Sequence, residues 1–170
     1  MTVEASWYAA YVGVGSNLND PAAQVRRACT ALAGLTHVRV VATSRLYHSP
    51  PVGYLDQPAF VNAVVAVITQ LDMGAFFAQL RQLEVALGKT DPTVRFGPRC
   101  IDLDLLVYAE QLSQTEQLVV PHPRLHERAF VLYPFNEIAP DLWIAGHGRV
   151  RRLAQAVDGA GVVPLMDDKS

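Results

Sequence analysis

The residues with the clearest chemical potential are two aspartates, Asp102 and Asp104, which are separated by one leucine. They belong to residues 101–108, a short apolar segment with alternating polarity at its start, and this pattern predicts a β-strand. Residues i and i+2 of a strand point to the same face, with Cα atoms about 7 Å apart. Two carboxylates on one face repel each other, and a divalent cation removes that conflict. The spacing fits a Mg²⁺ site for phosphates, although two exposed acids at a strand edge would have the same spacing.

A loop rich in cations precedes the two acids. Arg95 and Arg99 flank the segment Phe96-Gly97-Pro98, and Arg99 stands three residues before Asp102. Arginine presents a planar fork of donors that suits phosphate oxygens, and phosphoryl transfer needs cations beside acidic metal ligands. A structural ion pair between Arg99 and an aspartate would explain the same proximity. The residues alone leave both interpretations open.

Composition and charge exclude several classes of protein. The chain has 170 residues, of which 51% are hydrophobic and 18% charged, and its formal charge is −2. This balance predicts one globular domain over residues 1–170 and argues against binding nucleic acid through bulk electrostatics. The longest apolar run, residues 63–68, is too short to span a bilayer, so no membrane partner is expected. Cys29 and Cys100 suit reduced thiols, and we expect a cytoplasmic monomer.

Two glycine-containing segments resemble phosphate-binding motifs but lack a required part. Gly13-Val14-Gly15 opens like a dinucleotide-binding fingerprint, yet its third glycine would fall at Leu18. Gly88-Lys89-Thr90 resembles the end of a P-loop, but the first glycine of that motif would fall at Leu83. Neither segment therefore predicts a nucleotide site by itself.

The predicted elements that must position these residues follow the order β-α-β-β-α-β. Asp20-Pro21 and Asp72 are helix start signals, and Gly88 is an end signal. The order is that of a ferredoxin-like α+β core built from two split βαβ halves, with extra C-terminal elements and a mostly antiparallel sheet flanked by helices. The expected strands are residues 7–14, 38–46, 60–68, 101–108 and a short one ending at 119–120, and the expected helices are residues 20–32, 72–87, 126–135 and 150–157.

A longer segment around the two aspartates resembles a known signature. Residues 96–104, Phe-Gly-Pro-Arg-Cys-Ile-Asp-Leu-Asp, are similar to the signature of the 6-hydroxymethyl-7,8-dihydropterin pyrophosphokinase family. Three further blocks resemble the family in the same order, and the matches run from about residue 11 to residue 141. Agreement of four separate blocks is more specific than any one of them. The other blocks are residues 12–18, residues 49–62 and Pro121-His122-Pro123 with Arg128-Ala129-Phe130.

The resemblance implies an activity. It implies an enzyme that transfers diphosphate from ATP to 6-hydroxymethyl-7,8-dihydropterin in folate biosynthesis and releases AMP, so ATP and the pterin are the expected partners. It implies two Mg²⁺ ions, bound with ATP and held by Asp102 and Asp104. Arg99 and Lys89 are counted with these aspartates as catalytic residues. The group that accepts the proton of the pterin alcohol stays open, with Asp104 the better placed.

The resemblance also assigns two substrate sites. Phe60 and Phe130 are the expected aromatic walls of the pterin site, although without the family they would be read as core residues. Asn62 is expected to read the amide edge of the pterin. The full expected pterin site is Ser49, Val52, Phe60, Asn62 and Phe130, and the expected ATP contacts are Glu84, Arg99, Leu105, His122 and Arg128.

The sequence departs from the family pattern in the loop before the signature. Lys89 and Asp91 stand where the family usually has arginine, and Phe96 replaces the usual tryptophan. Lysine offers a point charge instead of a fork, which predicts a looser grip on phosphate. This loop is the feature that favours an alternative, a catalytically silent ferredoxin-like module that binds pterin or nucleotide. A generic ATP-hydrolysing kinase, which would release ADP, is a third hypothesis.

Overall fold

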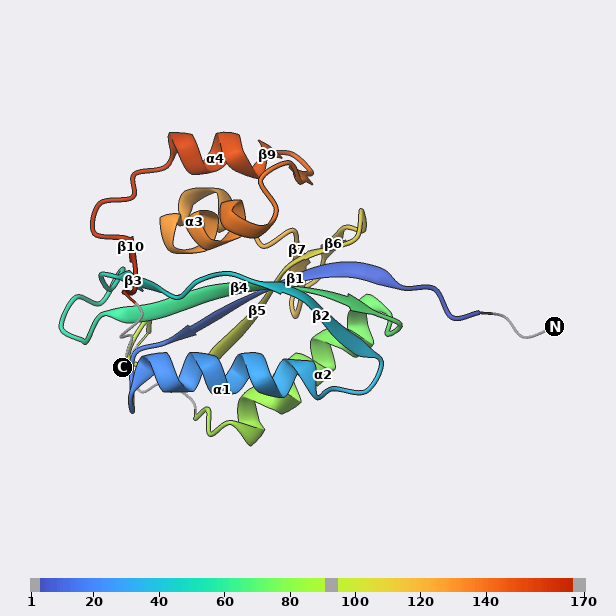
Figure 1. Cartoon of the computed structure of the whole chain (residues 1–170), viewed down its shortest axis with the longest axis horizontal. Coiled ribbons are helices and arrows are strands. Elements are labelled where there is room, and N and C mark those ends of the chain that lie inside the picture. Colours follow the sequence, from blue (N-terminus) through green and yellow to red (C-terminus); the bar gives the residue numbers. More distant parts are fainter. Residues whose placement is uncertain (1–3, 91–94, 167–170) are drawn as a thin grey trace.

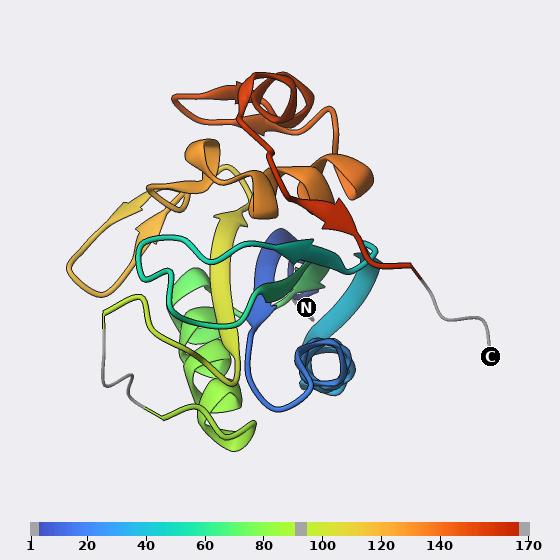
Figure 2. The same cartoon turned by 90° about the vertical axis from the view of Figure 1, so that its left-hand side faces the viewer.

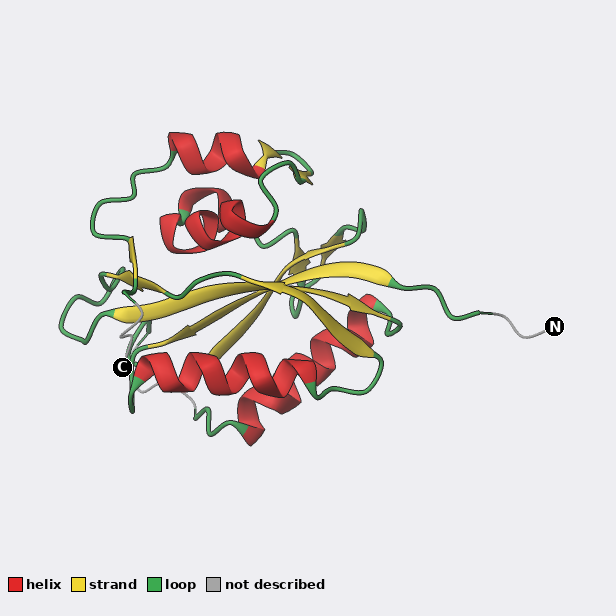
Figure 3. Cartoon of the chain, in the orientation of Figure 1, coloured by secondary structure: helices red, strands yellow, loops and turns green. Residues whose placement is uncertain are grey.

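The computed structural model describes residues 4–90 and 95–166. An antiparallel sheet forms its middle layer, with helices on both faces (Figures 1 and 3). Helices α1 (Pro21–Ala33) and α2 (Met73–Ala86) cover one face, and α3 (Ala129–Ile138) covers the other. Asp91, where the sequence departs from the family pattern, lies outside the described residues.

The sheet has the strand order of the predicted fold. Strand β1 (Tyr8–Ser16) lies between β4 (Phe60–Thr69) and β5 (Asp102–Tyr108) and is antiparallel to both. On its other side β4 pairs with β2 (Val38–Thr43) and β3 (Tyr47–Ser49). The strand β5 therefore lies at one edge of the sheet, with β1 as its neighbour. This arrangement confirms the ferredoxin-like α+β prediction.

The strand predicted for residues 38–46 is divided into β2 and β3, and Ser44 lies in the break. Ser44 donates its backbone N–H to the carbonyl of Val64 at 3.0 Å, and its hydroxyl accepts the backbone N–H of Val64 at 2.9 Å. A buried side-chain oxygen thus takes the place of a backbone carbonyl in one hydrogen bond between the strands. Hydrophobic pattern alone does not reveal this kind of break.

Both predicted helix starts are confirmed. Asp20 accepts the backbone N–H of Ala23 at 3.3 Å, and Asp72 accepts that of Ala75 at 2.8 Å. The predicted end of α2 is also confirmed, because Gly88 has a φ of +99°, where glycine is the residue least strained.

The C-terminal third adds short elements to the core. The helix predicted for residues 126–135 is instead a 3₁₀ turn followed by α3, because the extended backbone of Arg128 separates the two. None of the helices in the described part of the chain has both the length and the apolar character that crossing a bilayer requires. The added elements are β6 (Ser113–Gln114), β7 (Val119–Val120), η1 (Leu125–Glu127), β8 (Trp143–Ile144), β9 (Gly148–Arg149), α4 (Val150–Ala156) and β10 (Val163–Pro164), which pairs with β3.

Alternation along β5 decides which way the two aspartates point. Leu103 and Leu105 belong to the apolar core under α1 and α2, whereas Leu106 belongs to the core under α3. Because successive strand residues point to opposite faces, Asp102 and Asp104 share the face of Leu106. Both carboxylates therefore lie on the α3 side of the sheet.

Candidate functional site

Two cavities meet at the edge strand β5. The first has a volume of about 250 Å³ and lies between the ends of β1, β4 and β5 and the start of α3. The second has a volume of about 240 Å³ and lies along β5, the middle of α2 and the segment around β7. Within the described part of the chain, Asp104 is the one residue that lines both cavities. The predicted metal site is thus at the junction of the two.

All five residues predicted to bind the pterin line the first cavity, namely Ser49, Val52, Phe60, Asn62 and Phe130. Asn62 is buried in β4, and its amide donates to the hydroxyl of Ser49 at 2.7 Å. A buried amide is retained where it has partners, so this pair gives the apolar cavity a fixed polar wall. The first cavity has the properties of a site for a flat, hydrogen-bonding heterocycle.

The residues predicted to bind ATP are divided between three places. Leu105 and His122 line the second cavity, whereas Arg99 and Arg128 line the first. Glu84 lines neither of them. Arg124, which has no role in the sequence-based prediction, also lines the first cavity and adds a cation to its wall.

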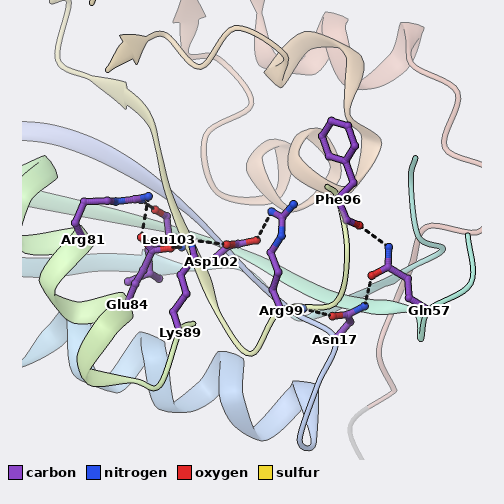
Figure 4. Close-up of polar contacts among 9 residues, drawn as sticks. All are labelled: Asn17, Gln57, Arg81, Glu84, Lys89, Phe96, Arg99, Asp102 and Leu103. Carbon is purple, nitrogen blue, oxygen red and sulfur yellow. Dashed lines mark hydrogen bonds and ion pairs between the residues drawn. The ribbon is translucent and has the colours of Figure 1, made fainter. Parts of the chain in front are cut away.

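The Asp102 carboxylate is paired on both oxygens. Its Oδ2 lies 2.8 Å from a guanidinium nitrogen of Arg99, and its Oδ1 lies 2.9 Å from Nζ of Lys89 (Figure 4). The ion pair that the sequence left open is therefore present. Burial alone would lower the pKa of Lys89, but the nearby carboxylates of Asp102 and Glu84 outweigh it and raise that pKa. Lys89 is accordingly charged at neutral pH.

Asp104 has a different environment from Asp102. Burial raises its pKa above the usual value, and the Asp102 carboxylate raises it further, against the opposing effects of His122, Arg81 and Arg128. Burial lowers the pKa of His122 despite its carboxylate neighbour, so this imidazole is neutral at pH 7. Asp104 makes no ion pair with any residue that the structure describes. A carboxylate in this situation favours a cation or a proton.

The buried side chain of Glu84 contacts the edge strand β5 from helix α2. Its carboxylate is 2% exposed and lies 2.8 Å from a guanidinium nitrogen of Arg81 and 2.6 Å from Nζ of Lys89. It also accepts the backbone N–H of Leu103 at 3.1 Å, and Arg81 donates to the Leu103 carbonyl (Figure 4). These two side chains satisfy the outward-facing backbone groups of Leu103, as a neighbouring strand would. Glu84 and Arg81 thereby fix the part of β5 that lies between Asp102 and Asp104.

Asn17, for which the sequence predicted no role, connects three loops. Its Oδ1 accepts the backbone N–H of Arg99 at 2.8 Å, and its amide donates to Oε1 of Gln57 at 2.9 Å. Gln57 in turn donates to the carbonyl of Phe96 at 2.7 Å (Figure 4). Figure 2 shows the loop after β3 and the loop before β5 on the same side of the molecule. The signal for Asn17 in the sequence was its position as a polar residue directly after a buried strand.

The donor set at the junction fits Mg²⁺ only together with a substrate. In residues 4–90 and 95–166 no group of three or more His, Cys, Asp or Glu side chains is arranged to hold a metal ion. Mg²⁺ commonly uses one or two carboxylates and completes its shell with water and substrate phosphates. Asp102 and Asp104 supply two carboxylates, and the cationic side chains around them suit a polyphosphate.

A sequence model of one family matches most of the chain. The family is described as 7,8-dihydro-6-hydroxymethylpterin-pyrophosphokinase (HPPK), and the match covers residues 11–140. This chain belongs to the 7,8-dihydro-6-hydroxymethylpterin-pyrophosphokinase family. The resemblance noted in the sequence is thereby confirmed.

Curated relatives support the same family. The chain is 44% identical over 153 residues to a 2-amino-4-hydroxy-6-hydroxymethyldihydropteridine pyrophosphokinase of Methylorubrum extorquens, covering 90% of this chain and 96% of that one. It is 41% identical over 155 residues to the Pseudomonas aeruginosa protein of the same name, covering 91% and 95%. It is also 40% identical over 134 residues to the folic acid synthesis protein fol1 of Pneumocystis carinii, covering 79% of this chain and 18% of that longer protein.

Solved structures share the fold. A crystal structure of wild-type Plasmodium falciparum HPPK-DHPS with pteroate has a TM-score of 0.69 and 13% sequence identity, and the match covers 91% of this chain and 43% of that chain. This chain thus spans less than half the length of that protein. At this identity the likeness concerns the fold alone.

Proposed function

We propose that this chain transfers diphosphate from ATP to 6-hydroxymethyl-7,8-dihydropterin and releases AMP, with the reacting groups meeting at Asp104. Family membership makes the chain an ATP-dependent pyrophosphokinase of folate biosynthesis. The observation that carries the site assignment is that Asp104 lines both cavities, since a transfer between two substrates needs one place that both reach.

The pterin is assigned to the first cavity. Phe60 and Phe130 line it, and aromatic side chains suit the faces of a flat ring. The buried pair of Asn62 and Ser49 supplies hydrogen-bonding groups for the ring edge. We propose that the hydroxymethyl group of the pterin points towards the aspartates, since Asp102 and Asp104 line the same cavity.

The nucleotide is assigned to the second cavity. Leu105 and His122 line it, and we propose that they contact the base and ribose of ATP. The triphosphate then passes over the edge of β5 to Asp104, where Arg99 and Arg128 line the adjoining cavity. Guanidinium groups can hold phosphate oxygens through paired hydrogen bonds, so these arginines are the expected phosphate contacts.

Asp102 and Asp104 would hold Mg²⁺ between them and the triphosphate, and we propose two ions. Bound there, the metal would neutralise phosphate charge and favour loss of the proton from the pterin alcohol. The raised pKa of Asp104 and its lack of an ion pair within the described residues are the features that support a cation at this carboxylate.

The transfer itself requires few covalent changes. The hydroxymethyl oxygen of the pterin attacks the β-phosphorus of ATP, and the bond between that phosphorus and the oxygen bridging to the α-phosphorus breaks. AMP leaves with the electron pair of that bond, and the alcohol loses its proton. We propose Asp104 as the acceptor of this proton, because burial beside Asp102 makes its carboxylate more basic than an exposed one. The side chains around it hold the reactants in line and exclude water.

Product analysis tests the function directly. The purified chain is incubated with MgATP and 6-hydroxymethyl-7,8-dihydropterin, and nucleotides are separated by ion-exchange chromatography. We expect AMP and the pterin diphosphate in equal amounts, and far less AMP from Asp104→Asn. Glu110→Gln is the matched control, because Glu110 is an exposed acid at the opposite end of β5. ADP as the product would indicate a generic kinase, and no nucleotide product would indicate a silent binding module.

We also propose that the chain works as a one-domain monomer. Its central six-stranded sheet connects the elements around both cavities, and described residues of this one chain line each cavity. Sedimentation equilibrium tests the oligomeric state, and titration with Mn²⁺ in the presence of an unreactive ATP analogue tests the number of ions. The expected cytoplasmic location stays a prediction.

A further inference from the structure

The Lys89 ammonium is shared between two carboxylates that belong to different parts of the fold. It lies 2.6 Å from Oε2 of Glu84 on α2 and 2.9 Å from Oδ1 of Asp102 on β5 (Figure 4). Glu84 is on the helix side of the sheet, whereas Asp102 faces the opposite side with the first cavity. The side chain of Lys89 therefore passes around the edge strand β5. It links Glu84 on the helix side of the sheet to Asp102 at the candidate metal site.

The backbone holds Lys89 in this position. Gly88 and Lys89 end α2 in a Schellman motif, in which the N–H of Gly88 bonds to the carbonyl of Val85 and that of Lys89 to the carbonyl of Glu84, both at 3.0 Å. Glu84 is thus joined to Lys89 twice, through its backbone and through its side chain. The lysine ammonium has a defined place without any ligand.

In this position the Lys89 ammonium occupies Oδ1 of Asp102. A magnesium ion needs ligand oxygens at about 2.0–2.1 Å, so an ammonium group in contact with the same oxygen would be held close to the ion and would oppose its binding. The other oxygen, Oδ2, lies 2.8 Å from a guanidinium nitrogen of Arg99. The charges of Lys89 and Arg99 would also repel a divalent cation at this short range. Each oxygen of Asp102 as observed is therefore already paired with a cation that a metal ion would have to displace.

We infer that Lys89 is the resident counter-ion of Asp102 in the nucleotide-free protein, and that Glu84 is the positioning residue that retains Lys89 when a metal ion replaces it. The metal and the lysine compete for Oδ1 of Asp102. Glu84, which the resemblance assigned to ATP, then acts through Lys89 and not by touching the nucleotide. This inference rests on the proposed function, since it takes Asp102 as a metal ligand.

Metal binding without nucleotide tests the competition. The probe is Mn²⁺ alone, and free Mn²⁺ is measured by electron paramagnetic resonance during titration of the full chain. Lys89→Met removes the competing cation, so we expect the dissociation constant for Mn²⁺ to fall about tenfold. Arg152→Met is the matched control, because Arg152 is an exposed cation on α4 that lines neither cavity. Equal values for Lys89→Met, Arg152→Met and the unaltered chain would overturn the inference.

Glu84→Gln tests the second half of the inference. The lysine then has Asp102 as its remaining carboxylate, so we expect Mn²⁺ to bind more weakly than to the unaltered chain. The double variant Glu84→Gln/Lys89→Met keeps the net charge of the chain but removes the ammonium from Oδ1. We expect it to bind Mn²⁺ more tightly than the unaltered chain, whereas equal binding would mean that net charge alone acts and would overturn the proposal. If Glu84→Gln does not fold, the comparison of Lys89→Met with Arg152→Met decides the question.

A second titration separates failure of this inference from failure of the proposed function. Mn²⁺ is added with an unreactive ATP analogue and the pterin present. If the unaltered chain and Asp102→Asn bind Mn²⁺ equally under these conditions, Asp102 is not a metal ligand and the proposed metal site fails with the inference. If Asp102→Asn loses Mn²⁺ but Lys89→Met does not alter binding of Mn²⁺ alone, the competition alone is wrong.

Discussion

Gly15 of β1 lies directly opposite Asn62 of β4, and a Cβ atom at Gly15 would be 2.8 Å from Oδ1 of Asn62. Contacts of a Cβ below 3.0 Å are essentially absent from real structures, so a side chain at Gly15 would displace the amide. The amide of Asn62 donates to Ser49, and both residues line the first cavity. The absence of a side chain at Gly15 therefore places the polar wall of the proposed pterin site.

Gly15→Ala should weaken pterin binding. The added methyl group moves the Asn62 amide, and we expect the KM for the pterin to rise about tenfold with a smaller change in kcat, as for loss of a ground-state contact. Steady-state kinetics with each substrate varied in turn would measure it. Gly13→Ala is the control, because its Cβ would be 3.4 Å from a flexible methyl group of Leu106. An equal effect of both variants on the pterin KM would contradict the role given to Gly15.

Asp102→Asn should remove activity more than stability. We expect kcat to fall by about three orders of magnitude, because a neutral amide holds a divalent ion between protein and phosphates much more weakly than a carboxylate does. Stability should change little, since the ion pairs with Lys89 and Arg99 are lost together with the repulsion from Asp104. Turnover and thermal unfolding are measured on the same preparation. A large fall in Tm with activity retained would show a structural role instead.

Local patterns in the sequence predicted much of the fold because the residues that decide it are close together along the chain. Asp20, Asp72 and Gly88 act within a few residues of their own positions, and the structure confirms each of them. The common face of Asp102 and Asp104 follows from strand geometry alone. The resemblance to the family added the list of cavity residues, which no local pattern contains.

The features that the sequence did not predict depend on contacts across the fold. The hydrogen bond between Glu84 and the backbone of β5 depends on how α2 packs on the sheet, because 19 positions separate Glu84 from Leu103. The bridge from Asn17 to Arg99 spans 82 positions. The break at Ser44 depends on a buried bond to Val64. None of these leaves a periodic signal in the sequence.

Asn17→Ala should affect both substrates. Asn17 joins the segment before β5, which lines the first cavity at Arg99, to the loop of Gln57, which lines it at Val52. We expect higher KM values for ATP and the pterin and a loss of stability of about 1–2 kcal/mol. A double-mutant cycle with Gln57→Ala would measure the coupling. Fully additive effects on KM would mean that the two residues act separately.

Lys89→Arg should tighten the grip on phosphate once a bound metal ion has displaced the side chain at this position from Asp102. A guanidinium fork can bond two phosphate oxygens where the ammonium offers a point charge, so we expect a lower KM for ATP and a higher kcat. Steady-state kinetics at saturating pterin would measure the change. A kcat and KM that are unchanged or worse would show that Lys89 is matched to its place between Glu84 and Asp102.

Glu137→Gln should destabilise the protein in a pH-dependent manner. The carboxylate of Glu137 accepts the Tyr47 hydroxyl at 2.5 Å and the backbone N–H of Arg45 at 2.7 Å, which connects α3 to the segment around β3. Burial alone would raise the pKa of Glu137, but these hydrogen bonds and the Arg45 guanidinium outweigh it, so the pKa is lower than usual. A group whose pKa is lower in the folded state stabilises that state when it is ionised.

The lowered pKa of Glu137 determines the pH range in which its carboxylate stabilises the folded state. The stabilisation from Glu137 is complete above the ordinary glutamate pKa of about 4.3 and is lost as the pH falls through the lower pKa of the folded state. We therefore expect Glu137→Gln to lower the free energy of unfolding by about 1 kcal/mol at pH 7, because these bonds are partly exposed, and by less near pH 3. Urea unfolding at several pH values measures both, with Glu110→Gln as an exposed control. A difference from the unaltered chain that is constant with pH would mean that Glu137 acts through packing and not through its charge.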